Sequence, residues 1–178
     1  MKASKVDINM NDFPEGLEML ILQSIDVQNF TGKLKARKKL VGMGNTIIIH
    51  LHKLLKSNKT LLRKEASKIV ELIAHRNSIP LLIDLLDDPD FDIRWIAAEG
   101  LIKIGRRSIL PLLKSVRDGK SSLLFNEGAH HVLNGLLYHS EKEKLIVLMQ
   151  SLENYHSLGE TAPTDAAIAL KTVFRCKT

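Results

Sequence analysis

The chain has 178 residues, of which 44% are hydrophobic and 4% aromatic, a composition that predicts one domain with an aliphatic core. Its single cysteine, Cys176, excludes a disulfide framework or a structural zinc site built from several thiolates, and favours a cytoplasmic protein. The net charge of +6 is concentrated in residues 31–76, which are strongly basic, and no apolar run approaches the roughly 18 residues of a membrane span, so no membrane partner is expected.

The first expected elements form an N-terminal cap over residues 12–45. Apolar residues recur every three or four positions over residues 14–25, a spacing that predicts an amphipathic helix. A second helix is expected over residues 27–43. Together the two helices would cover one end of the structure that follows, which is the usual role of a terminal unit in a repeat protein.

A repeat of about 31 residues comes next, and its clear copies span residues 46–137. Moving residues 78–105 forward by one copy brings Pro80 onto Pro111, and the apolar positions that follow each proline also coincide. Such internal similarity indicates a repeat architecture, in which each copy covers the apolar face of its neighbour.

Each copy is predicted to contain two helices. Pro80 suits the first turn of the first helix, where a missing N–H group costs little. The acidic turn at residues 87–90 ends that helix, and Asp90 can cap the next one. The second helix would bury one stripe of side chains, namely Ile93, Ala97, Leu101 and Ile104. The sequence therefore predicts an all-α fold, an α-solenoid of about five helix-turn-helix units with capping helices.

The C-terminal cap is expected over residues 138–178. Helices are predicted over residues 142–152 and 165–174, joined by a loop over residues 155–163 that is longer than the turns inside the repeats. No stretch rich in Pro, Gly or Ser interrupts the chain, so residues 1–178 are predicted to form a single domain.

Residues 85–90 (Leu-Leu-Asp-Asp-Pro-Asp) and 93–101 (Ile-Arg-Trp-Ile-Ala-Ala-Glu-Gly-Leu) resemble the HEAT repeat, and most closely its short bilin-lyase-like group. The resemblance is specific over residues 78–105 and clear over about 46–137. It implies an α-solenoid whose second helices line a concave face.

The resemblance also implies a ladder of polar contacts, in which an arginine early in the second helix bonds an aspartate at the turn. Arg94 with Asp88 or Asp90 fits this role. The copies on either side depart from the pattern and are expected to interrupt the ladder: Arg63 faces Ser57 instead of an aspartate, and Phe125 stands in place of the arginine.

The repeat spacing also places two columns of side chains on the exposed side of the second helices. The first column consists of Leu34, Lys64, Trp95 and Asn126. The second, beside it, consists of Lys38, Lys68, Glu99 and His130. An exposed aromatic side chain among charged groups is a candidate recognition residue. The alternative is that Trp95 packs against the adjacent helix.

Motifs of common catalytic and metal sites are missing from the sequence. There is no phosphate-binding Gly-x-x-x-x-Gly-Lys-Ser/Thr loop, no His-Glu-x-x-His and no Gly-x-Ser-x-Gly. The aspartates of residues 84–92 lack the glycine and closing glutamate of an EF-hand, and a helix stop followed by a helix cap explains them better. The protein is therefore expected to need no metal or cofactor and not to be an enzyme.

The leading hypothesis is a non-enzymatic scaffold that binds an acidic protein surface or peptide segment. Trp95 would anchor that segment, and three lysines of the columns would supply charge: Lys38, Lys64 and Lys68. The alternative is nucleic-acid binding through the basic block at residues 31–76. A helical-repeat DNA glycosylase, with Trp95 and Glu99 at the site, and a bilin lyase are weaker alternatives, as is a purely structural role.

Overall fold

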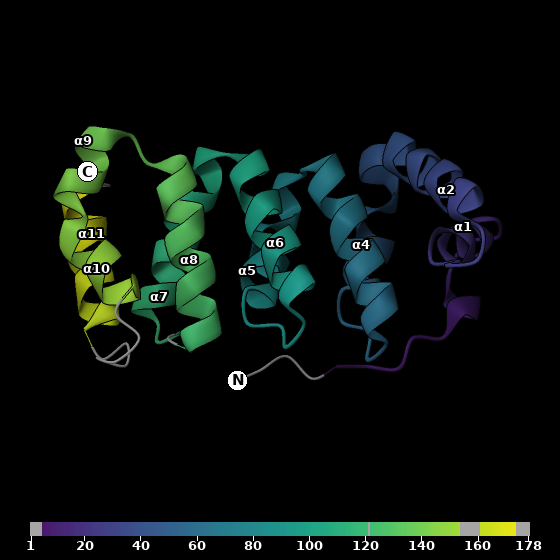
Figure 1. Cartoon of the computed structure of the whole chain (residues 1–178), viewed down its shortest axis with the longest axis horizontal. Coiled ribbons are helices and arrows are strands. Elements are labelled where there is room, and N and C mark those ends of the chain that lie inside the picture. The colour runs from purple at the N-terminus through teal and green to yellow at the C-terminus, as the bar shows by residue number, and fades with distance from the viewer. Residues whose placement is uncertain (1–4, 121, 154–160, 174–178) are drawn as a thin grey trace.

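The computed structural model describes residues 5–120, 122–153 and 161–173. Over these residues the chain folds into eleven α-helices and four short 3₁₀ helices, without a named β-strand. The helices follow one another along a single line (Figure 1), and one hydrophobic cluster runs from Phe13 to Ala169. The predicted all-α solenoid is confirmed.

The helices form two layers. Helices α2, α4, α6, α8 and α10 lie in the layer that faces the viewer in Figure 1, and we call it the second layer; α1, α3, α5, α7 and α11 lie behind it. Within the second layer α2 contacts α4, α4 contacts α6, α6 contacts α8, and α8 contacts α10. The bounds are α1 (Leu17–Ser24), α2 (Phe30–Met43), α3 (Ile48–Leu54), α4 (Thr60–Ile73), α5 (Ile79–Leu85), α6 (Phe91–Ile104), α7 (Ile109–Arg117), α8 (Leu123–Leu136), α9 (His139–Lys144), α10 (Ile146–Glu153) and α11 (Ala162–Val173).

The central pair, α5 and α6, forms for the reasons that the sequence suggested. Pro80 lies in the first turn of α5. The Asp90 carboxylate caps α6 by accepting hydrogen bonds from the backbone N–H groups of Asp92 and Ile93, at 3.0 and 3.2 Å. Gly105 ends α6 with a φ of 90°, which a residue with a side chain rarely adopts.

The core lies between the two layers and is built from aliphatic side chains. The predicted stripe of α6 is buried except for Ile104, which is only partly covered. The layers approach closely where a glycine faces a leucine. A Cβ atom on Gly128 would lie 2.9 Å from the Cδ2 atom of Leu86, which follows α5, so the missing side chain lets α8 approach this buried leucine closely.

The two caps begin and end differently from the prediction. Helix α1 begins at Leu17, after a left-handed glycine, Gly16, so Pro14 stays outside it. Helix α2 begins at Phe30 because the Asn29 side chain caps it. The single helix expected over residues 142–152 is two helices, α9 and α10.

At the C-terminus, the last helix, α11, begins three residues earlier than predicted and packs against α7. Most of the predicted loop over residues 155–163 lies outside the described residues, as does Cys176. None of the described helices combines the length and the apolar character needed to cross a bilayer.

An extended N-terminal segment crosses the turns that join the two layers, a feature that the sequence did not reveal (Figure 1). The Val6 N–H group donates to the carbonyl of Lys56 at 2.8 Å, and the Val6 carbonyl accepts from the N–H group of Asn58 at 2.9 Å. One residue earlier in the chain, the Lys5 ammonium lies 3.5 Å from the carboxylate of Asp88, in the turn before α6. The segment therefore ties two successive turns together.

Candidate binding face

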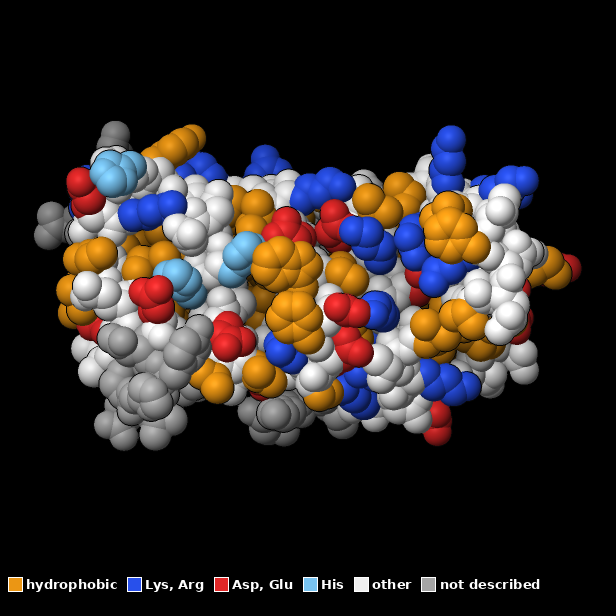
Figure 2. Space-filling model, in the orientation of Figure 1, with side chains coloured by type: hydrophobic (Ala, Val, Ile, Leu, Met, Phe, Trp, Pro, Cys, Tyr) orange, Lys and Arg blue, Asp and Glu red, His pale blue; other side chains and the backbone are white. Residues whose placement is uncertain are grey.

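A row of exposed apolar side chains crosses the outward face of four second-layer helices. Each member lies in the N-terminal half of its helix, and the helices lie side by side. We call these residues the apolar row: Phe30, Leu34, Leu61, Phe91, Trp95 and Leu123. Figure 2 shows hydrophobic side chains gathered at the centre of this face, over α6, with charged groups around them. Exposed apolar side chains that gather in this way are typical of interaction sites.

Two aromatic side chains of α6 form the centre of the row. The rings of Phe91 and Trp95 stack with their centroids 6.4 Å apart, and the two side chains keep 63% and 49% of their surfaces exposed. The His131 ring of α8 lies 4.6 Å from Trp95 on its other side. Trp95 is therefore both packed and accessible, so the two alternatives weighed from the sequence each hold in part.

A hydrogen bond holds His131 in this position. Its Nε2 atom lies 2.8 Å from the Oε1 atom of Glu99, so the two side chains link α6 to α8. On the opposite side, the Arg94 guanidinium lies 5.5 Å from the centre of the Phe91 ring. The aromatic centre is thus supported on both flanks, which reduces the conformational entropy that a partner's binding would cost.

The lysines of α4 near this centre are already paired. Lys64 bonds the carboxylate of Asp92, an interaction that raises the pKa of Lys64. Lys68 lies 2.7 Å from the carboxylate of Glu71, and Lys103 lies 3.6 Å from the same group. These pairs neutralise much of the positive charge that the sequence places on α4.

Helix α2 carries positive charge that is not neutralised. It holds five basic and no acidic residues. Arg37 is bound by both oxygens of Glu65, at 2.6 Å each, and this contact raises the Arg37 pKa. Lys35, Lys38 and Lys39 are exposed and make no ion pair with any other described residue. A group of unpaired positive charges therefore lies at the N-terminal end of the face.

A buried arginine joins successive helix pairs. The Arg63 side chain of α4 is 3% exposed, and its Nε and Nη2 atoms donate to the Asp88 carboxylate at 2.9 and 3.2 Å. Its Nη1 atom donates to the carbonyls of Ser57 and Asn58, in the turn that precedes α4. Arg94 repeats the second half of this pattern, donating to two carbonyls in the turn before α6.

Comparison with known families agrees with this repeated geometry. Residues 48–129 match the family model described as HEAT repeats. HEAT repeats are therefore supported over residues 48–129. A search among curated proteins found no match.

In these HEAT repeats the arginines of the predicted ladder have different partners from those expected. Arg94 reaches the backbone carbonyls of Asp88 and Pro89, not the carboxylate of Asp88 or Asp90 as expected. The Asp88 carboxylate is instead held by Arg63 from the preceding repeat, and the Asp90 carboxylate is used as a helix cap. The expectation that Arg63 would lack an aspartate was therefore wrong.

The HEAT repeat at α7 and α8 is one residue longer than predicted. Helix α6 begins at residue 91 and α8 at residue 123, a spacing of 32, whereas α4 and α6 begin 31 residues apart. The extra residue turns Asn126 inward, where it is only 6% exposed, so it cannot belong to the exposed column. It is Asn126, and not Phe125, that stands where the other repeats carry arginine.

The same change of register moves the last members of both columns. Glu127 takes the outward position that was assigned to Asn126, and His131 takes the position assigned to His130, which is half-buried. The sequence analysis missed His131, although the polar turn before α8 offered a signal, since Ser122 is its helix cap. The other predicted residues, Lys38, Lys64 and Lys68 among them, lie on the second layer as expected.

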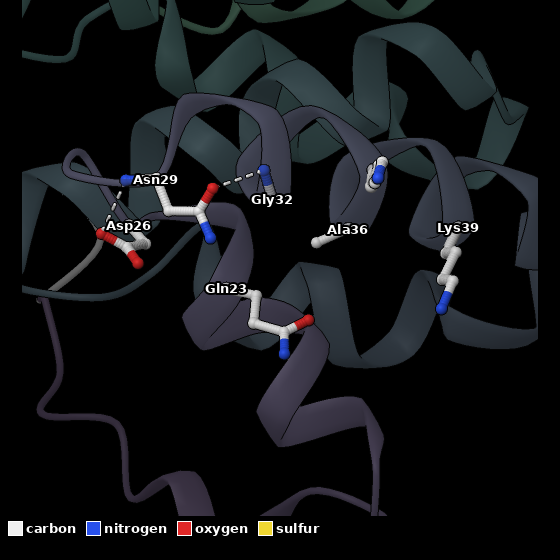
Figure 3. Close-up of a pocket in the computed structure, with 7 residues that line it drawn as sticks. Gln23, Asp26, Asn29, Gly32, Ala36 and Lys39 are labelled. Carbon is white, nitrogen blue, oxygen red and sulfur yellow. Dashed lines mark hydrogen bonds between the residues drawn. The ribbon is translucent and has the colours of Figure 1, made fainter.

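A pocket of about 210 Å³ lies at the N-terminal end of the solenoid, between α1 and α2 (Figure 3). The Asp26 and Asn29 side chains that line it already bond backbone N–H groups at the start of α2. Lys35 and Lys39 stand at its edge. The pocket is therefore small, and most of its polar side chains already have hydrogen-bond partners. The two lysines at its edge belong to the basic surface of α2.

The histidines outside the face have structural surroundings. The Nε2 atom of His52 lies 3.0 Å from the Ser78 hydroxyl, and burial, followed by the nearby positive charge of His75 and Lys56, lowers the pKa of His52. The described residues contain no group of three or more His, Cys, Asp or Glu side chains arranged to hold a metal ion.

Proposed function

We propose that the protein is a non-enzymatic binding module whose protein partner lies along the apolar row. The observation that carries this proposal is the exposed, stacked pair of Phe91 and Trp95 at the centre of the second-layer face. Aromatic side chains that are rigidly held and only partly covered are the commonest energetic anchors of protein interfaces. Two aromatic rings exposed side by side contribute little to the protein's own core, and such exposed apolar pairs are typical of interaction sites.

The HEAT repeats support the same function. Helical repeats of this kind present extended surfaces made of equivalent positions on successive helices, and these surfaces generally bind other proteins. The apolar row follows that geometry, because its members occupy the N-terminal halves of neighbouring helices. A partner segment lying across the helices would contact each of them in turn.

A peptide-display selection tests this proposal. A random peptide library is selected against the wild-type protein and, in parallel, against a Phe91→Ala/Trp95→Ala variant. Both side chains are largely exposed, so the variant keeps its core. We expect the wild-type selection to enrich peptides that bind at least about tenfold more weakly to the variant. Peptides that bind both proteins equally well, or no enrichment at all, would contradict the proposal.

Nucleic-acid binding is the second candidate, and the unpaired lysines of α2 favour it. Binding of that kind would depend mainly on phosphate contacts and would weaken steeply between about 50 and about 200 mM salt. Among the described aromatic residues, only Phe30 lies on α2 itself, whereas sequence-tolerant single-strand binding uses several stacking side chains along a basic channel. We therefore rank it below protein binding.

We propose that the repeats belong to the short bilin-lyase-like group and that the protein acts in the cytoplasm. We propose no catalytic role for Glu99, because its carboxylate is engaged by His131 on an open surface. A base-releasing activity on damaged DNA that disappears in a Glu99→Gln variant would contradict that last point.

A further inference from the structure

The binding face separates its apolar centre from its positive charge. The apolar centre lies on α6, and the acidic groups around it are Asp92, Glu99 and Glu127. An acidic side chain of a partner is disfavoured there, since Lys64 is already bound to Asp92 and Arg94, which lies 5.5 Å from the centre of the Phe91 ring, already donates to two backbone carbonyls. A group of unpaired cations lies two helices away, on α2.

The helix packing sets the distance between these two regions. Helix α2 contacts α4 and α4 contacts α6, so two interhelical steps of about 8–10 Å, or about 16–20 Å in total, separate α2 from α6. An extended chain covers about 3.3–3.6 Å per residue. About five or six residues of a partner segment would therefore bridge the two regions.

Lys35 and Lys38 lie on the exposed side of α2, because the residues that this helix buries in the core are Ala36 and Leu40. Leu34, a member of the apolar row, is exposed on the same helix. The aliphatic stems of the lysines and this leucine can cover the partner's backbone while the ammonium groups meet its charges. The α2 end of the face thus combines apolar contact with positive charge.

From this arrangement we infer that the partner is a bipartite extended segment: an aromatic or aliphatic anchor for Phe91 and Trp95, and an acidic cluster for α2, separated by about five or six residues. The inference rests on the proposed function and specifies the chemistry of its ligand. The anchor supplies most of the affinity, and the acidic cluster fixes the direction in which the segment lies across the helices.

Synthetic peptides test the inference directly. The probe is a fluorescein-labelled peptide with Leu-Phe-Leu, a spacer of six Ser and Gly residues, and four Glu. One comparison peptide carries four Lys in place of Glu, and another has a spacer of only two residues. Binding is measured by fluorescence anisotropy at about 50 mM salt. We expect the probe to bind about tenfold more tightly than either comparison peptide.

Matched charge reversals assign the effect to α2. In the Lys35→Glu/Lys38→Glu variant we expect the probe to lose about tenfold in affinity. The control is Lys53→Glu/Lys114→Glu, which makes the same change of charge on exposed positions of the other layer, in α3 and α7. It should change the affinity by less than about twofold.

The outcomes separate the inference from the proposed function. Equal binding of the Glu and Lys peptides, or equal losses in the two double variants, would overturn the inference. Equal binding of the long and short spacers would overturn its geometry. Display-selected peptides that lack acidic residues but bind only when Phe91 and Trp95 are present would contradict the inference and still agree with the proposed function. Tight, salt-sensitive binding of a single-stranded oligonucleotide, with no peptide bound, would overturn both.

Discussion

The buried pair of Arg63 and Asp88 should be the most sensitive polar contact in the solenoid. Their side chains are 3% and 2% exposed, and the guanidinium donates two hydrogen bonds to the carboxylate. Arg63→Ala leaves the buried Asp88 carboxylate with the Lys5 ammonium, 3.5 Å away, and the Asp90 N–H group as its remaining partners, and breaking a buried pair of this kind typically costs about 3–5 kcal/mol of unfolding free energy. That is a large share of the about 5–15 kcal/mol that stabilises a typical domain.

Arg94 offers a matched comparison because it lies at the equivalent place in the next repeat. Its Nη1 atom donates to the carbonyls of Asp88 and Pro89, and no carboxylate of another described residue is bound to it. Arg94→Ala therefore removes hydrogen bonds to backbone groups near the surface and should cost only about 1–2 kcal/mol. The difference in unfolding free energy between the two variants therefore measures the cost of leaving the buried carboxylate without its arginine.

Urea unfolding, followed both by circular dichroism and by Trp95 fluorescence, provides the measurement, since coincident transitions justify a two-state free energy. If Arg63→Ala does not fold, Arg63→Lys keeps the charge but loses the paired geometry, and it should still cost more than Arg94→Lys. Equal losses at the two arginines would refute the reasoning.

Three further results are expected. Gly42→Ala should stabilise the protein by about 0.5–1 kcal/mol, because no atom lies within 4 Å of the added Cβ and alanine favours helix. Gly128→Ala should destabilise it by about 1–3 kcal/mol, because its Cβ would lie 2.9 Å from Leu86; thermal unfolding checks both. Because burial lowers the pKa of His52, folding stability is fully present above about pH 6.5 and declines as the pH falls below it; His52→Gln should flatten that decline in urea titrations between about pH 7 and 5.

The central repeat could be predicted from the sequence because its signals are local. A proline in the first turn of α5, an aspartate cap on α6 and a glycine after it each act within a few residues. Periodicity then predicts which side of α6 is buried. The same reasoning identified Trp95 as an exposed position, because its place on the helix follows from its neighbours.

The last repeat could not be predicted in detail because one added residue changes everything after it. The turn before α8 makes the spacing 32 residues, and a shift of one residue rotates a helix by about 100°. Asn126 therefore faces the core and His131 meets Trp95. Periodicity within α8 alone would have been a better guide than the spacing between repeats.

Charge neutralisation was the other feature beyond sequence reasoning. The basic block reads as a uniform positive segment, yet Arg37, Arg63 and Lys64 are bound by acidic groups 25 to 28 residues further along the chain. Such pairs depend on how successive helices pack, which local patterns do not specify. The consequence is a smaller positive region on the second layer, where the unpaired lysines of α2 stand together.

The emission of Trp95 tests the central claim most directly, because it is the protein's sole tryptophan and lies in the middle of the apolar row. A display-selected peptide without tryptophan is titrated into the protein while anisotropy reports its binding. The account predicts that Trp95 emission shifts to shorter wavelength and that its quenching by acrylamide falls, both saturating together with the anisotropy. Saturating anisotropy with unchanged Trp95 emission and quenching would contradict it.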